Sequence, residues 1–305
     1  MSTTEYDAFG PWIYEVTTPE EVPPLFRDHP LDLASCRYVI KVPRDIARRD
    51  ATPNMDLYDH LLAAGPDTLT VLSRQPTSVG TLTVPYGAIS AVEHSVDLLD
   101  GRLTVHTTTE QPAVRVRYNG SSRELVDALV TVIRKAYLGD EPAPAHVRPS
   151  PARTLRLGDL GESDVALVSE QHALRREEPT VTLLAAHPRT AVLPRGGGGP
   201  GGLATRAVHT AWPMTLQGAL VCSDGREVQI IHRRHWWIRG RRPVHSIART
   251  VFPISRVQSV SVRDDERYAG VRVVSLHLGT TALEIPVPQG SDAENVLSRA
   301  QQLTP

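Results

Sequence analysis

The sequence contains the same pattern twice: short apolar runs followed by one segment in which apolar residues recur at helical spacing. The first copy begins with VPYGAISAV at 84–92 and the second with VFPISRVQSV at 251–260, and both contain the run Pro-x-x-x-[Ile/Val]-x-x-Val. Because this order is kept over about fifty residues, the chain is interpreted as two copies of one strand-rich unit that ends in a helix. The later segments lie at 103–107, 114–118 and 122–138 in the first copy, and at 271–278, 283–287 and 291–303 in the second.

The apolar runs of the first half are short and bounded by turn residues, as strands are. Several of them alternate with polar residues, which places one face on a core and the other in water. Asp100-Gly101 is a hairpin-turn signal in this region. Seven antiparallel strands are expected, at 12–16, 37–42, 68–73, 81–84, 88–94, 103–107 and 114–118.

Two helices are predicted in the same half. Apolar residues recur at helical spacing over 121–138, where Ser121 or Ser122 is expected to cap the start and Gly139 to end the helix. A shorter helix is predicted at 55–64, MDLYDHLLAA, between the strands.

A proline-rich segment divides the chain. A length of 305 residues favours two domains, and EPAPAHVRPSP at 141–151 carries four prolines, each of which fixes φ and removes a backbone donor. We expect a first unit at 9–139, a linker at 140–160 and a second, diverged unit at 161–305. GGGGPGG at 196–202 is expected to be a surface loop.

Composition excludes several function classes. The net charge of -1 gives no global field toward a polyanion, and only two of the 33 basic residues are lysines, a bias typical of high-GC, actinobacterial-type codon usage. The two isolated cysteines fit neither a disulfide framework nor a zinc site, and no signal peptide or membrane span is visible. No P-loop, nucleophile elbow or dinucleotide fingerprint is present. We therefore expect a cytoplasmic protein that is not an enzyme and has no cofactor and no metal.

The segment 226–249 is rich in arginine and contains two adjacent tryptophans. One interpretation is a site for anionic lipid headgroups or nucleic acid, because guanidinium groups meet phosphates and tryptophan stacks or lies at a membrane interface. The other is a β-hairpin with one tryptophan in the core and a solvated arginine turn at 239–242. The candidate binding residues are Arg233, Arg234, Trp236, Trp237, Arg239, Arg241 and Arg242.

The segment 41–62 inserts charge and proline where a minimal barrel needs only a turn. It is either a surface network of ion pairs or a recognition loop, since long structured insertions are often binding elements. The candidate binding residues here are Arg44, Arg48, Arg49 and Tyr58.

A run of about seven antiparallel strands closed by an amphipathic helix, with the Pro-x-x-x-[Ile/Val]-x-x-Val strand before the last hairpin, resembles the pleckstrin-homology-like (PH-like) domains of bacteria. The resemblance implies a mainly β fold with α: two PH-like units, each a bent antiparallel sandwich or barrel capped by its C-terminal helix. It also implies a scaffold that binds a protein or peptide partner through a sheet edge or the inserted loops. Peripheral binding of anionic lipid headgroups or nucleic acid through 233–242 is the alternative.

Overall fold

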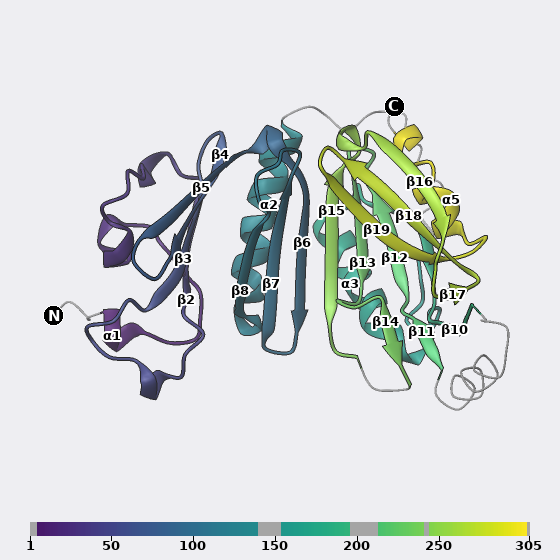
Figure 1. Ribbon diagram of the computed structural model, residues 1–305, viewed down its shortest axis with the longest axis horizontal. Coiled ribbons are helices and arrows are strands. Elements are labelled where there is room, and N and C mark those ends of the chain that lie inside the picture. Colours follow the sequence, from purple (N-terminus) through teal and green to yellow (C-terminus); the bar gives the residue numbers. More distant parts are fainter. Residues whose placement is uncertain (1–4, 140–153, 196–212, 241–243, 304–305) are drawn as a thin grey trace. The chain divides into compact units, whose positions relative to one another are not determined.

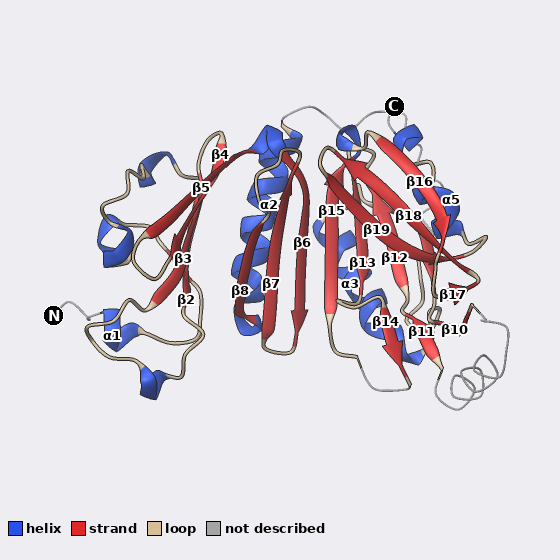
Figure 2. Ribbon diagram, in the orientation of Figure 1, coloured by secondary structure: helices blue, strands red, loops and turns tan. Residues whose placement is uncertain are grey.

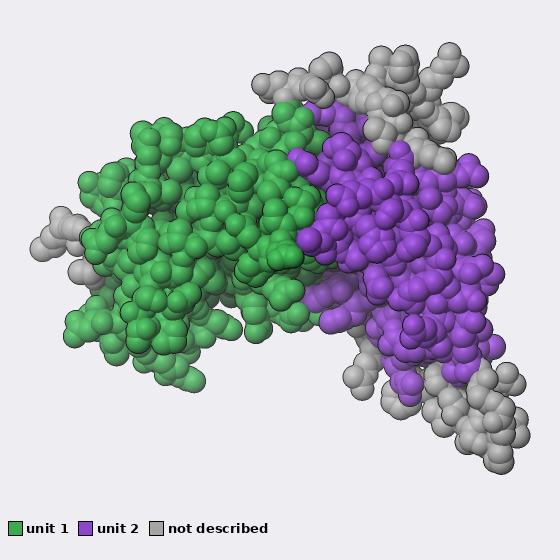
Figure 3. All heavy atoms as spheres, turned by 45° about the horizontal axis from the view of Figure 1, so that its top comes forward, with its two compact units in different colours: residues 1–141 green, residues 142–305 purple. Residues whose placement is uncertain are grey.

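The structure is a computed structural model that describes residues 5–139, 154–195, 213–240 and 244–303. Its described part is mainly β, with several antiparallel sheets and few helices (Figure 2). The chain divides into two compact units, Met1–Glu141 and Pro142–Pro305 (Figure 3). Most of the predicted linker and the glycine loop at 196–202 lie outside the described residues.

The first unit contains two antiparallel sheets and a long helix (Figure 1). One sheet runs in the order β1-β2-β3-β4-β5, and a separate meander pairs β6 with β7 and β7 with β8. All seven predicted strands are present. The strands are β1 (Tyr14–Glu15), β2 (Tyr38–Pro43), β3 (Tyr58–Ala64), β4 (Thr68–Arg74), β5 (Val79–Pro85), β6 (Ile89–Asp97), β7 (Asp100–Thr107) and β8 (Val114–Asn119).

The helix predicted at 55–64 is wrong, because β3 occupies this segment as an eighth strand. Leu62 and Ala64 pack into one hydrophobic cluster, while Leu61 and Ala63 pack into another on the opposite face of the strand. A strand covered on both faces needs consecutive apolar residues instead of alternation. Such a run cannot be distinguished from a buried helix by periodicity alone.

The helix predicted at 121–138 is confirmed as α2 (Arg123–Leu138). It buries Leu129 and Ile133 in the cluster that also contains the inner faces of both sheets. Gly139 ends the helix with a φ of 64°, as expected. Ser122 precedes the helix, but its hydroxyl accepts a hydrogen bond from the backbone N–H of Ile13 at 3.0 Å instead of capping the first turn.

The hairpin that Asp100-Gly101 signals is present between β6 and β7, but its turn residues are Leu98 and Leu99, and Asp100 and Gly101 belong to β7. Asp97 pairs with Asp100 across the ladder, which leaves two leucines as the whole turn. Gly101 is needed for another reason: a Cβ there would lie 2.4 to 2.6 Å from ring atoms of Tyr118 on β8. The glycine therefore serves a close cross-strand packing, and Leu98 takes the positive φ, 54°.

The second unit contains a four-stranded meander, β15-β13-β12-β9, a three-stranded meander, β16-β18-β19, and a small sheet, β14-β11-β10-β17. Its strands are β9 (Thr182–His187), β10 (Thr190–Pro194), β11 (Met214–Leu216), β12 (Ala219–Ser223), β13 (Glu227–His232), β14 (Trp237–Arg239), β15 (Ile247–Pro253), β16 (Ser259–Asp264), β17 (Tyr268–Ala269), β18 (Val271–Leu278) and β19 (Thr281–Pro288).

The helices of the second unit depart from the sequence prediction. In place of one helix over 291–303, a short helix α5 (Asp292–Leu297) is followed by a 3-10 turn, Ala300–Leu303. A further helix, α3 (Val165–Glu177), was not predicted. Leu155 and Leu160 pack in the same cluster as α3, so 154–160 belongs to the core of this unit and not to a linker.

Part of the element order is common to the two units. In each, four neighbouring strands of one sheet (β2 to β5, and β9, β12, β13, β15) precede a 3-10 turn, a three-stranded antiparallel sheet and a helix, while the second unit also has β10, β11, β14 and β17 among these strands. Within the described part of each unit, no ladder joins the four-stranded to the three-stranded sheet, so the sheets are not closed into a barrel. No helix among the described residues is long and apolar enough to cross a membrane.

Replacing Gly101 with Ala should destabilise the first unit. The added methyl group would overlap the ring of Tyr118, and overpacking of a filled site costs about 1–3 kcal/mol. Urea unfolding of the full chain measures this as a lower transition midpoint. Gly158→Ala is the control, because a Cβ at Gly158 meets nothing within 4 Å. An unchanged midpoint in Gly101→Ala would contradict the packing described here.

Candidate binding cleft

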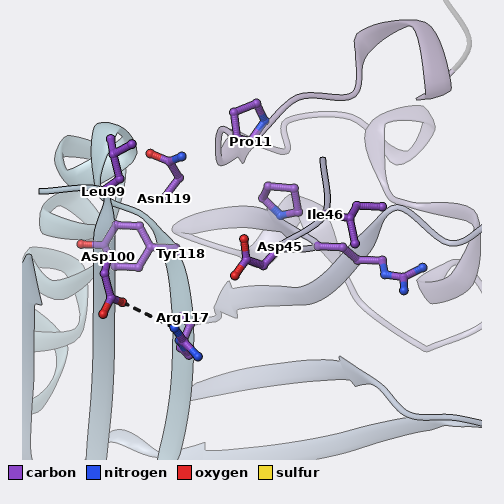
Figure 4. Close-up of a pocket in the computed structure, with 10 residues that line it drawn as sticks. Pro11, Asp45, Ile46, Leu99, Asp100, Arg117, Tyr118 and Asn119 are labelled. Atoms are coloured by element: carbon purple, nitrogen blue, oxygen red, sulfur yellow. Dashed lines mark ion pairs between the residues drawn. The ribbon is translucent and has the colours of Figure 1, made fainter. Parts of the chain in front are cut away.

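A cleft of about 300 Å³ opens in the first unit (Figure 4). One wall comes from the segment that leaves β2, and the other from the β6–β7 turn and the end of β8. Polar and apolar side chains line it in similar proportion. The lining residues are Pro11, Pro43, Arg44, Asp45, Ile46, Leu99, Asp100, Arg117, Tyr118 and Asn119.

The ring of Tyr118 forms part of the β8 wall, and its hydroxyl points away from Asp45 across the cleft (Figure 4). That hydroxyl makes a short hydrogen bond with Nε2 of His94, whose Nδ1 lies 2.8 Å from Oδ1 of Asp127 on α2. Tyr118 and His94 are both buried. The chain of hydrogen bonds therefore joins the cleft wall to the helix and fixes the ring, because buried polar networks hold a unique geometry.

Burial raises the pKa of the Asp127 carboxyl, but the hydrogen bond and charge of His94, together with Arg123, outweigh burial and leave this pKa below its ordinary value of 3.8. Arg123 Nε lies 3.1 Å from Oδ2 of Asp127. The carboxylate thus accepts from both neighbours in its ionised form.

Some charged side chains of the cleft form ion pairs or hydrogen bonds, and one does not. Asp100 lies 2.8 Å from Arg102 and 4.0 Å from Arg117. Arg44 donates from Nη1 to the carbonyl oxygen of Asp56 at 3.1 Å. Asp45 is exposed, its carboxylate points across the cleft toward Tyr118, and it has no ion pair or hydrogen bond with any described residue (Figure 4).

Large apolar side chains are exposed at the rim of the cleft. Six are exposed in the described residues, and three of them belong to this region: Leu99 lines the cleft at 65% exposure, Leu98 beside it is 69% exposed, and Trp12 beside Pro11 is 51% exposed. Leu98 is also the one described non-glycine residue with a positive φ. A left-handed conformation costs a leucine about 1–2 kcal/mol. Exposed apolar surface combined with backbone strain is typical of interaction sites.

The structure does not bring together the binding residues that the sequence predicts in 41–62. Arg44 lines the cleft, but Arg48 donates to the backbone oxygens of Phe9 and Asp7. Arg49 is exposed and lies 3.8 Å from Asp50. Tyr58 is wrong as an exposed binding residue: it is buried in the core, where desolvation raises the pKa of its hydroxyl. The rim residues were missed, and their signal was an apolar pair where a tight turn normally carries asparagine and glycine.

Arg233 in the second unit is wrong as a surface phosphate ligand, because it is 1% exposed. Its Nη2 lies 3.1 Å from Oδ1 of the fully buried Asp164, and its Nη1 donates to the backbone oxygen of Ser246 at 2.9 Å. Arg189 binds the same carboxylate through Nε at 3.1 Å. Asp164 immediately precedes α3, so these ion pairs hold the start of the helix to β9–β10 and the segment after β13.

The two tryptophans lie outside the arms of a hairpin. β13 pairs directly with β15, as the hairpin interpretation expected, but Trp237 lies on β14, which pairs with β11. The ring of Trp236 stacks on His232 with centroids 4.3 Å apart. The ring centroids of Trp237 and Tyr268 are 4.6 Å apart. Arg234 is partly buried, Arg239 is exposed at the end of β14, and Arg241 and Arg242 lie outside the described residues.

A groove of about 320 Å³ runs beside these tryptophans. Two arginines and three carboxylates line it: Arg263, Arg267, Asp265, Glu266 and Glu284. Arg263 is paired with Glu284 at 3.0 Å, and Arg267 lies over the ring of Trp237 at 5.7 Å from its centroid. A lining with more carboxylates than guanidinium groups does not favour a polyanion.

Histidine and cysteine positions give no metal site. Within the described ranges, no group of three or more His, Cys, Asp or Glu side chains is arranged to hold a metal ion. Both ring nitrogens of His232 are engaged, by the Arg233 carbonyl at 2.7 Å and the Thr250 hydroxyl at 2.9 Å. Burial raises the pKa of the Cys222 thiol to about 12, which leaves it protonated and unreactive.

Replacing Asp164 with Asn should strongly destabilise the second unit. The variant leaves two arginines, one of them fully buried, without a counter-charge, and breaking a buried pair in this way costs about 3–5 kcal/mol. Urea unfolding of the full chain measures the loss. In the control, Glu266→Gln removes an exposed partner of Arg263 and should change stability by less than about 0.5 kcal/mol. Equal effects of the two variants would contradict a structural role for Asp164.

Acid should reveal the contribution of Asp127. Because the pKa of this carboxyl is lowered by folding, its ionisation stabilises the native state above the ordinary value of 3.8, and this stabilisation is lost as pH falls through the native pKa. The stability difference between the protein and Asp127→Asn should therefore shrink between about pH 5 and pH 2, as urea midpoints measure. Asp28→Asn, at an exposed position without a bonded partner in the described residues, should parallel the unmodified protein throughout.

Comparison of the chain with models of known protein families, with curated proteins and with solved structures gives no match in any of the three. Function therefore has to be inferred from the chemistry of the site itself. The first-unit cleft is the described site that combines a concave surface, exposed apolar groups and a charged group without a bonded partner.

Proposed function

We propose that this protein is a cytoplasmic, non-catalytic interaction module that binds a protein or peptide partner through the cleft of its first unit. The observation that carries the proposal is the exposed, strained leucine turn at the rim. A turn built from Leu98 and Leu99 exposes apolar surface at a position where polar residues are normally found. Burial against a partner would remove that surface from water and offset its cost.

A PH-like fold for each unit is part of this proposal. The resemblance implies about seven antiparallel strands closed by a helix, and the order of strands followed by α2 in the first unit supports it, while the second unit has additional strands and a shorter helix, α5. In the first unit α2 packs on the core shared by the two sheets, as a capping helix would. Domains of this kind are scaffolds whose ligand is set by loops and sheet edges, so the fold supports binding without naming the ligand.

The arginines favour protein or peptide binding over binding of phosphate-bearing surfaces, because carboxylates lie beside them. Arg233 is satisfied internally by Asp164, and Arg267 and Arg263 lie among carboxylates. The first-unit cleft has two arginines and two aspartates, so it offers no net positive charge to a polyanion.

The proposal predicts that Leu98→Ser combined with Leu99→Ser abolishes partner binding without unfolding the chain. Immobilised protein would capture partners from a lysate of its native cells, and bound proteins would be quantified against the double variant. The control is Leu157→Ser, which removes an exposed leucine of the second unit, 50% exposed in the structure. Binding driven by apolar contact should change little between low and physiological salt.

Two results would contradict the proposal. One is capture of the same proteins, in the same amounts, by the double variant and by the unmodified chain. The other is recovery of anionic lipid vesicles or oligonucleotides with steep loss between low and physiological salt, which would favour the phosphate-binding alternative.

A further inference from the structure

The first-unit cleft contains one carboxylate without a bonded partner among the described residues, that of Asp45. It is exposed and has no ion pair or hydrogen bond with a described residue. The acid on the opposite wall is different, because Asp100 is already shared between Arg102 and Arg117. Figure 4 shows the Asp45 carboxylate directed across the cleft toward Tyr118.

Neither arginine that lines the cleft forms an ion pair with Asp45. Arg117 lies beside Asp100, and Arg44 donates to the backbone oxygen of Asp56, which is not among the residues that line the cleft. The four charged lining residues sum to zero, and Asp45 is the carboxylate among them that has no ion pair with a described residue. Arg48 and Arg49 in the same segment bind elsewhere, to the backbone oxygens of Phe9 and Asp7 and beside Asp50.

Apolar groups lie on both walls of the cleft that contains this carboxylate. Ile46 follows it on the same wall, while Leu99 and the ring of Tyr118 lie on the other. Apolar groups on both walls, together with a carboxylate that has no ion pair, fit a side chain with an aliphatic stem and a cationic head, since lysine and arginine bury their methylene groups and keep the charge at the tip. A charge-assisted hydrogen bond to a carboxylate is about twice as strong as a neutral one.

We infer that the occupant of the cleft is a peptide segment of a protein partner that combines a basic residue with an apolar anchor. The basic side chain meets Asp45, and the apolar anchor packs on Leu98 and Leu99 at the rim. This inference rests on the proposed function and specifies the chemistry of the partner. Charge complementarity at Asp45 selects a basic segment over a neutral or acidic one.

Three pools of capped 12-residue peptides test the inference with the full chain. All pools share two leucines at fixed positions, and two further positions carry Lys in one pool, Gln in the second and Glu in the third. Dissociation constants would be measured by fluorescence anisotropy at physiological salt. The Lys pool should bind roughly ten-fold more tightly than the Gln pool, which corresponds to one charge-assisted contact.

Asp45→Asn should remove most of that ten-fold preference while leaving binding of the Gln pool unchanged. Asp50→Asn is the matched control, because Asp50 is an exposed acid of the same segment that does not line the cleft. The control should retain the Lys preference. Leu98→Ser with Leu99→Ser should weaken all three pools together.

The outcomes separate the inference from the proposed function. Tightest binding of the Glu pool, or a Lys preference that survives Asp45→Asn, would overturn the basic partner while leaving peptide binding intact. Failure of every pool to bind the unmodified chain would also overturn it. If, in addition, lysate capture is unaffected by the double leucine variant, the proposed function fails as well.

Discussion

The close approach of Tyr118 to Gly101 positions one wall of the first-unit cleft and the exposed leucine turn beside it. With no Cβ at Gly101, the ring of Tyr118 lies against the backbone of β7, and its hydroxyl reaches His94 and, through it, Asp127 of α2. One contact thus joins two strands and a helix. It also uses the glycine that would otherwise make the hairpin turn, so the turn forms at Leu98–Leu99 and the strain falls on a leucine.

Gly120 makes a second close approach, to the backbone of the exposed leucine turn. Gly120 donates its N–H to the backbone oxygen of Leu99 at 2.7 Å, and a Cβ on Gly120 would lie 2.4 Å from the backbone oxygen of Leu98. Both contacts hold the backbone of the turn against Gly120. Under the proposed function, a turn held in this way would lose less conformational entropy on binding than a free loop would.

Sequence reasoning succeeded where one local signal decided the structure and failed where tertiary packing did. The period of 121–138 and the alternation of 114–118 predicted α2 and β8, because each element has one face on a core and one in water. β3 was missed since its core lies on both faces, and Gly101 was misread because the reason for glycine is a ring on the neighbouring strand. The cleft could not be predicted: Asp45 and Tyr118 are 73 residues apart in the sequence, and which arginines pair internally depends on burial.

The two units join the first two strands of their three-stranded meanders in different ways. In the first unit, β6 and β7 are joined by the two-residue leucine turn. In the second, the equivalent strands β16 and β18 are joined by a longer segment in which buried Asp265 accepts hydrogen bonds from the N–H groups of Arg267 and Tyr268. The second connection therefore satisfies its own polar groups and exposes charge where the first exposes apolar surface. Because binding specificity lies in such loops and not in the scaffold, the partner proposed for the first unit would find no matching apolar surface at this position in the second.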